Sequence, residues 1–270
     1  MRLQVRHETH YVYETTVSAS IQRLTLTPPS FGSQKVIQWT IEAPGMDSAL
    51  VYRDGFGNQV HLVTEKERHD SVTVIAQGTV DCADSSGIVR GLFCPAPDGV
   101  FLRQTPMTLP SAEITEIAEA ARRAEKKNIL HQLHALMAAI HERIAYEIGV
   151  TNARTTASEA FSLGRGVCQD HTHVFLSAAR HLRIPGRYVT GYLATEEGEF
   201  ATAAHAWAEA LVPDLGWVGF DAANGKCPTD HYVRVATGLD APSVMPVRGS
   251  RRGGADENMT VSVSVQPAEQ

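Results

Sequence analysis

Cys168 follows two glycines and opens a segment with helical periodicity, an arrangement that suits a nucleophilic thiol. The glycines of residues 164–168 (GRGVC) free the backbone to turn tightly, and the apolar spacing through residues 174–182 predicts a helix that begins at or beside the cysteine. The unpaired N–H groups and the positive end of the helix dipole would stabilise a thiolate and lower the pKa of the thiol. Cys168 is therefore a candidate nucleophile near neutral pH.

A candidate base and a candidate carboxylate follow downstream. His205 lies in residues 203–212, a run that alternates large and small side chains as a strand does. After a turn at 213–216, a second short strand ends at Asp221. A hairpin of these strands would bring Asp221 beside His205, where the carboxylate would accept a hydrogen bond from the imidazole, fix its tautomer and favour the imidazolium. The three residues would form a Cys-His-Asp triad.

Residues near this triad are candidates for supporting roles. The backbone N–H of Cys168 is the natural donor to an oxyanion, and Tyr146 and Gln169 are the candidates for a second donor. Trp207 belongs either to the core or to a wall of the substrate cleft. Asp170 suits the first helical turn, where its charge complements the helix dipole.

The N-terminal part of the chain has the pattern of an all-β module. Polar and apolar residues alternate in short runs with turn signals between them, which predicts strands at 3–13, 19–27, 36–41, 49–54, 59–65 and 71–80. Their regular spacing indicates a sandwich or half-barrel. Residues 81–110 are rich in proline and turn residues and read as a connector, so we place the domain boundary near residue 105. The predicted domains are an N-terminal β domain, 1–105, and a core, 106–270.

The core begins with helices and continues with strands. Helical periodicity covers parts of 111–163 and then 168–182, and strand patterns follow at 187–194, 204–212 and 217–221. Helices first and strands second indicate an α+β fold rather than βαβ repetition. Two more strand patterns occur in the tail, at 231–236 and 259–265. The tail either completes the core sheet or pairs with the β domain, and we favour the first.

Four blocks resemble the bacterial transglutaminase-like cysteine protease family. They are GVCQDHTH (166–173), PGRYVTGY (185–192), HAW (205–207) and GFD (219–221), in the family's order and with similar gaps. The opening HxTxYxY at residues 7–13 resembles the β domain that commonly precedes this core. The resemblance implies an α+β fold with a papain-like, transglutaminase-like cysteine proteinase core behind an all-β N-terminal domain.

Composition limits the classes of protein. The 270 residues are 43% hydrophobic and 20% charged, as in a soluble globular protein, and the net charge of -6 disfavours nucleic-acid binding. The chain shows neither the apolar core of a signal peptide nor an apolar run long enough for a membrane span, so we expect a cytoplasmic protein. Four cysteines do not make a disulfide framework. Nothing in the sequence predicts an oligomeric state.

No cofactor is expected, because the sequence holds neither a nucleotide-binding glycine motif nor an acidic EF-hand-like loop. A zinc site is an alternative reading of Cys168, His171 and His173 with His205. Positions 171 and 173 of one helix point about 200° apart, which disfavours a shared metal.

These observations predict thiol-dependent acyl transfer on a peptide or protein substrate that carries an amide. We favour hydrolysis, because a transglutaminase must exclude water through a closed apolar acceptor channel that nothing in the sequence identifies. The alternatives are a protein-glutamine transglutaminase, with an amine as acceptor, and a non-catalytic binding module on the same scaffold. The intact Cys, His and Asp argue against the binding module, which would need none of them.

Overall fold

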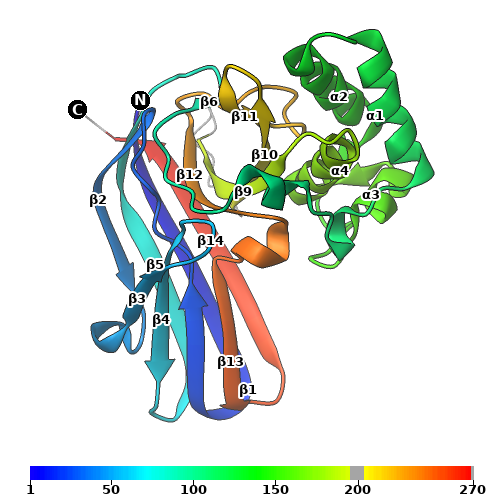
Figure 1. The fold of residues 1–270 in the computed structure, drawn as a ribbon. Helices are drawn as coiled ribbons and strands as arrows, with labels where there is room; N and C mark the ends of the chain where they lie inside the picture. Colours follow the sequence, from blue (N-terminus) through cyan, green and yellow to red (C-terminus); the bar gives the residue numbers. More distant parts are fainter. Residues whose placement is uncertain (195–203, 269–270) are drawn as a thin grey trace.

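The computed structural model describes residues 1–194 and 204–268. A long sheet forms one part of the molecule, and a smaller sheet with the α-helices forms the other (Figure 1). Helices and antiparallel strands are segregated along the chain, so the predicted α+β class is confirmed.

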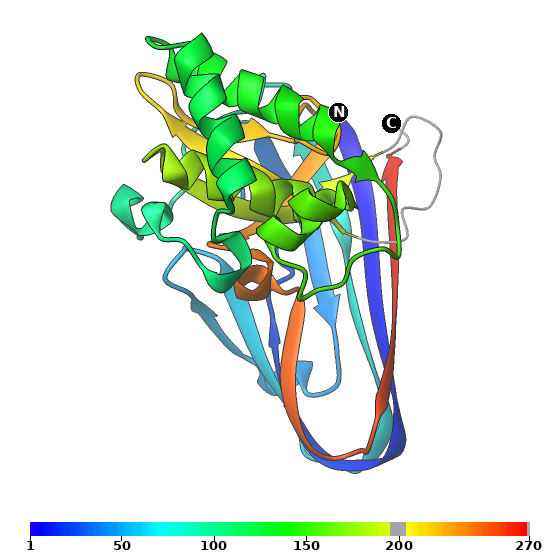
Figure 2. The same ribbon diagram turned by 90° about the vertical axis from the view of Figure 1, so that its right-hand side faces the viewer.

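The larger sheet is built around its longest strand, β1 (Arg2–Leu24). On one side, β1 pairs with β5 (His69–Cys82) and then with β4 (Gln59–Glu65). On the other side, it pairs with β14 (Glu257–Pro267) and then with β13 (Val247–Gly253). The sheet is extended by β2 (Gln34–Glu42) beside β5 and by β3 (Leu50–Arg53) beside β4. The register of β1 shifts near Val17. At the same place, the strands that flank β1 change from β5 and β14 to β4 and β13. These strands bend at one end of the sheet (Figure 2). Residues from both halves of β1 share one apolar cluster, so the bent sheet encloses its own core.

The C-terminal strands correct one expectation. β13 and β14 pair with β1 of the N-terminal sheet, so the expectation that the tail completes the core sheet is wrong for these strands. The reason is that the buried face of β14 pairs with the buried face of β1. Val263 and Val265 of β14 lie opposite His7 and Val5 of β1, and all four side chains are buried. Of the tail strands, β12 (Tyr232–Gly238) joins the core sheet.

The core sheet is antiparallel and has the strand order β12-β9-β10-β11-β6. Its other members are β9 (Gly186–Leu193), β10 (His205–Val212), β11 (Gly216–Phe220) and β6 (Ile88–Val89), the last contributed by the predicted connector. The small residues of β10, Ala206, Ala208 and Ala210, share a core with helix α4 (Cys168–His181). The large residues Trp207 and Glu209 alternate with them and point to the opposite face.

Three helices surround α4, which is buried along most of its length. They are α1 (Ala112–Ala124), capped by Ser111, α2 (Ile129–Arg143), capped by Asn128, and α3 (Ala157–Leu163), with a capping box of Thr156 and Glu159. The short elements are η1 (Met46–Ser48), η2 (Asp98–Leu102), η3 (Pro106–Thr108), η4 (Ala241–Val244), β7 (Ala145–Tyr146) and β8 (Arg165–Gly166). Burial on nearly all sides fixes the position of the first turn of α4.

Candidate active site

Cys168 is the first residue of α4, as predicted, and Asp170 holds the loop that precedes it. The Asp170 Oδ2 accepts hydrogen bonds from the Val167 N–H at 2.8 Å and from the Thr151 hydroxyl at 2.7 Å. A Cβ at Gly166 would lie 2.6 Å from the same oxygen, so this position requires glycine. Burial raises the pKa of Asp170, although these hydrogen bonds oppose the shift. The carboxyl group therefore supports the loop backbone.

Tyr146 and Gln169 both line the cleft into which Cys168 opens. Tyr146 is brought there by the parallel pairing of β7 with β8, which sets Tyr146 opposite Gly166. Burial and the negative charges of Cys168, Asp221 and Asp170 raise the pKa of Tyr146 to about 12, so the hydroxyl keeps its proton near neutral pH. Both side chains lie at the cleft as hydrogen-bond donors, and their part in oxyanion binding stays a prediction.

His205 and Asp221 meet at the end of the β10–β11 hairpin. Ala208 pairs with Phe220, and this register brings the His205 Nε2 to 2.7 Å from the Asp221 Oδ2. Burial lowers the pKa of His205, but the hydrogen bonds to Asp221 and Cys168 outweigh it and raise this pKa to about 10. Because Nε2 is held by Asp221, Nδ1 is the ring nitrogen left for the thiol of Cys168. The structure thus brings together the three side chains of the predicted triad.

Asp221 is fully buried and accepts hydrogen bonds at both oxygens. Oδ1 accepts from the backbone N–H groups of Ala223 and Asn224, at 3.1 and 3.2 Å. Oδ2 accepts from the Asn224 amide at 2.7 Å and from the Tyr232 hydroxyl at 2.8 Å, in addition to His205. Burial raises the pKa of Asp221, but these donors and His205 outweigh it and lower the pKa below its usual value.

Asn224 and Tyr232 were missed by the sequence analysis. Asn224 belongs to the turn DAANG directly after β11, where an asparagine three residues beyond the carboxylate was a usable signal. Tyr232 comes from β12, a strand separated from Asp221 by β9 and β10 in the sheet, and no local pattern could have indicated it.

Of the two roles given for Trp207, the structure favours the core, because Trp207 packs in a buried apolar cluster and is absent from the described residues that line the cleft. The indole is 2% exposed and lies behind the imidazole, with the ring centroids of Trp207 and His205 6.2 Å apart and nearly parallel. Tyr232 packs edge-on against Trp207, at 5.4 Å between centroids. The physical reason is that Tyr232 of β12 lies on the same face of the sheet as Trp207 and its ring reaches across β9 to the indole. Trp207 and Tyr232 shield the His205–Asp221 hydrogen bond from water.

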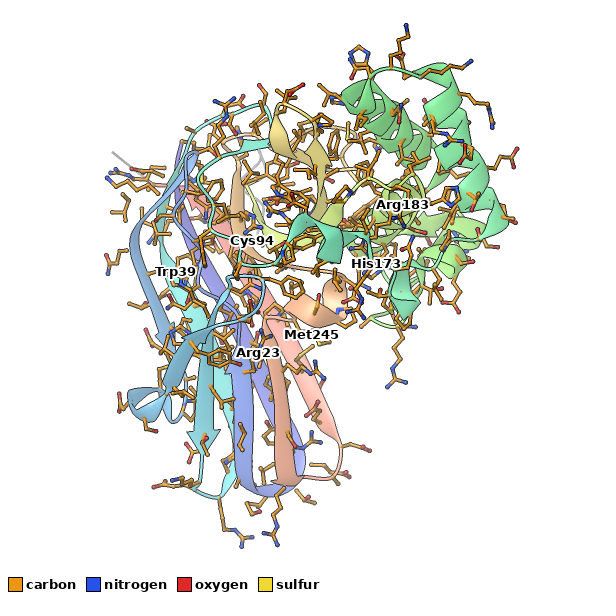
Figure 3. The ribbon with its side chains drawn as sticks, in the orientation of Figure 1. Arg23, Trp39, Cys94, His173, Arg183 and Met245 are labelled. Carbon is orange, nitrogen blue, oxygen red and sulfur yellow. The ribbon has the colours of Figure 1, made fainter. Side chains whose placement is uncertain are left out.

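His171 and His173 have partners other than a metal. The two ring nitrogens of His171 face the carbonyl oxygens of Val167 and Ile144, at 2.9 and 3.0 Å. The His173 Nε2 accepts a hydrogen bond from the Ala241 N–H at 3.1 Å, on the side of α4 toward η4 (Figure 3). Among residues 1–194 and 204–268, no three His, Cys, Asp or Glu side chains converge to form a site for a metal ion.

Cys168 and His205 open into a cleft of about 1210 Å³ between the two parts of the molecule. Its core wall includes Tyr146, Gln169 and Asn224. Its opposite wall comes from β1, β13 and β14, and Met245 lies where the walls meet (Figure 3). A thiol at a helix N-terminus and a histidine–carboxylate pair on an adjacent antiparallel sheet define a papain-like arrangement, suited to attack on a carbonyl carbon.

Comparison with known proteins agrees with this class. Residues 115–222 match the transglutaminase-like superfamily core, and residues 3–81 match the bacterial transglutaminase-like N-terminal region. The two matches together span more than half of the chain, and the chain belongs to the transglutaminase-like superfamily. The predicted family and the predicted fold class are thereby confirmed.

Similar proteins align with nearly the whole chain. The uncharacterized protein ML0607 of Mycobacterium leprae is 29% identical, over 97% of this chain and 98% of its own length. The uncharacterized protein Rv2569c of Mycobacterium tuberculosis is 28% identical, over 99% of this chain and 93% of its own length. A crystal structure from Cytophaga hutchinsonii, named as a putative cysteine protease, superimposes with a TM-score of 0.76 at 20% identity and covers 100% of this chain and 91% of that one. This likeness shows the fold.

In the described part of the chain, no helix is both long and apolar enough to cross a membrane. The compartment stays a prediction.

Proposed function

We propose that this protein is a thiol-dependent hydrolase of peptide or amide bonds, with Cys168 as nucleophile, His205 as acid and base, and Asp221 as the group that orients His205. The observation that carries the proposal is the His205–Asp221 pair, joined at 2.7 Å, which opens into the same cleft as the Cys168 thiol at the first turn of α4. Three groups in this order are what acyl transfer through a thioester requires.

The reaction proceeds in two halves. The Cys168 thiolate attacks the carbonyl carbon, a C–S bond forms, and the oxyanion is received by the free N–H of Cys168 and a side-chain donor, Tyr146 or Gln169. The His205 imidazolium gives its Nδ1 proton to the leaving amine, and the C–N bond breaks. Neutral His205 then takes a proton from water, which attacks the thioester; the C–S bond breaks, and the carboxylic acid leaves with the thiolate restored.

Water is favoured as the acceptor because the cleft is broad and accessible. The His205 side chain is 11% exposed, and Tyr146 and Ile148 at the cleft are 55% and 75% exposed. An amine acceptor would compete with 55 M water only in a closed apolar channel, and a cleft of this size with exposed walls admits water to the thioester.

The test uses an internally quenched peptide library in H₂¹⁸O, with and without excess cadaverine, and reads the products by mass spectrometry. We expect ¹⁸O in a new carboxyl group for the wild type and none for Cys168→Ala. Cys94→Ala removes a half-buried thiol outside the cleft and is the matched control (Figure 3). Iodoacetamide should modify Cys168 faster than Cys94, and this difference should disappear in His205→Ala.

Cadaverine incorporation in place of ¹⁸O would identify a transglutaminase. Absence of any product, together with equal alkylation of Cys168 and Cys94, would contradict acyl transfer and leave a binding module.

A further inference from the structure

The N-terminal HxTxYxY motif lies on the wall of the cleft that faces the candidate triad. His7, Thr9, Tyr11 and Tyr13 are alternate residues of β1, so their side chains share one face, and all four line the cleft with Cys168 and His205. The β domain therefore forms part of the site, and we expect its motif to contribute to substrate binding.

The first half of the motif anchors the two parts of the molecule to each other. The ring nitrogens of His7 lie 2.9 Å from the Tyr192 hydroxyl and 3.1 Å from the Thr9 hydroxyl. Burial lowers the pKa of His7 to about 4, so the ring is neutral at physiological pH. Tyr192 follows Gly191, the residue that pairs with His205. The anchor thus fixes β1 relative to the strand beside the candidate base.

The second half of the motif faces the open cleft. In the register of β1 with β14, Tyr11 pairs with Met259 and Thr9 with Val261, and both β14 residues also line the cleft. Met259 is 52% exposed, and Tyr11 is half-buried. We call Tyr11, Met259 and Val261 the β1–β14 face. An aromatic ring beside a flexible thioether and a valine suits an apolar or aromatic side chain.

The charges beside the β1–β14 face and the size of the cleft limit which ligands can bind there. Arg251 lies over the Tyr13 ring at 5.2 Å and forms an ion pair with Glu257, so these two charges at the end of the face compensate each other. The cleft of about 1210 Å³ is larger than the roughly 300–1,000 Å³ of most small-molecule sites. It therefore has room for several residues of a polypeptide, of which only one supplies the reacting amide.

We propose that the β1–β14 face binds an aromatic or long aliphatic side chain of an extended polypeptide substrate, at a position remote from the bond that Cys168 attacks. The proposal rests on the proposed function and specifies its substrate class. Catalysis and recognition are then divided between the two parts of the molecule: the smaller sheet and the helices carry the reacting groups, and the larger sheet selects the segment.

The experiment uses quenched peptides of about eight residues, or roughly 26 Å when extended, in which one Phe is moved through a Gly/Ser background. For the wild type we expect one Phe position remote from the cleaved bond to raise kcat/KM by at least about 10-fold over the peptide without Phe. Met259→Glu, at a half-exposed site that tolerates the change, and Tyr11→Ala should remove this preference. Val12→Ala is the matched control, because Val12 is 46% exposed on the opposite face of β1.

A second readout separates this inference from the proposed function. The burst of p-nitrophenol from p-nitrophenyl acetate, a short acyl donor, reports Cys168 alone and should be the same in the wild type, Met259→Glu and Val12→Ala. A normal burst with no Phe preference, or with a preference that survives both face variants, would overturn the β1–β14 face as a subsite. Loss of the burst in the wild type would instead overturn the proposed function.

Discussion

Asp221 and His205 lie on neighbouring antiparallel strands, with Oδ2 of the carboxylate 2.7 Å from Nε2 of the imidazole. Four further hydrogen bonds from protein donors fix the carboxylate, two at each oxygen. The carboxylate is therefore held as an acceptor on all sides, and the tautomer of His205 with its proton on Nε2 is favoured.

Asp221→Asn should lower turnover by about 10²- to 10⁴-fold. Whichever way the new amide is turned, its NH₂ group meets donors, either the backbone N–H groups at Oδ1 or His205, Tyr232 and Asn224 at Oδ2. The orientation of His205 is lost while the Cys168 thiol remains. Steady-state peptide hydrolysis and iodoacetamide alkylation, measured on the same preparation, check this; wild-type turnover would refute the role of Asp221.

The pH dependence follows from His205. Its pKa is raised from 6.5 to about 10, so the imidazolium persists through neutral pH and the acylation rate should fall only as pH rises toward 10. The same shift stabilises the fold fully below pH 6.5, and this contribution is lost between pH 6.5 and about 10. Because hydrogen bonds to Asp221 and Cys168 raise this pKa, Asp221→Asn and Cys168→Ala should both lower it.

An NMR titration of the His205 ring, with pH–rate profiles, measures these shifts. A His205 pKa that stays the same in both variants would contradict the assigned causes.

The sequence predicted those residues of the site whose positions depend on neighbouring residues in the chain. The glycines, the helix start and the alternation of residues 203–212 placed Cys168, His205 and Asp221 on the correct elements, because turn chemistry and side-chain periodicity act over a few residues. The roles of Tyr232 and Trp207 depend on the pairing of β12 with β9 in the core sheet. The pairing of β14 with β1 joins the two ends of the chain. Such non-local pairings leave no mark in local periodicity, and for this reason the strand at 259–265 was assigned to the wrong sheet.

Tyr232→Phe should lower kcat by about 10-fold and raise the His205 pKa, with the fold retained. The pKa rises because the Asp221 Oδ2 then keeps more of its negative charge for the imidazolium. The change removes one of three donors to the Asp221 Oδ2, and a hydrogen bond to a charged group contributes about 1.5–3 kcal/mol. Tyr192→Phe is the matched control, because Tyr192 is equally buried but bonds His7. It should lower the melting temperature and leave the titration of His205 unchanged. Equal effects of the two variants on that titration would show that Tyr232 is merely structural.

Gly166→Ala should destabilise the protein by about 1–3 kcal/mol and slow the alkylation of Cys168. The added Cβ would lie 2.6 Å from the Asp170 Oδ2, so the carboxyl group must leave the Val167 N–H and the first turn of α4 loses its support. Gly55→Ala is the control, since a Cβ there meets nothing within 4 Å. Thermal unfolding and alkylation rates of both variants, and of Gly166→Ala combined with Asp170→Ala, measure the coupling. Because the clash and the cap involve the same carboxyl group, the double variant should be less destabilised than the sum of the single changes; strict additivity would contradict Asp170 as the support of the nucleophile's loop.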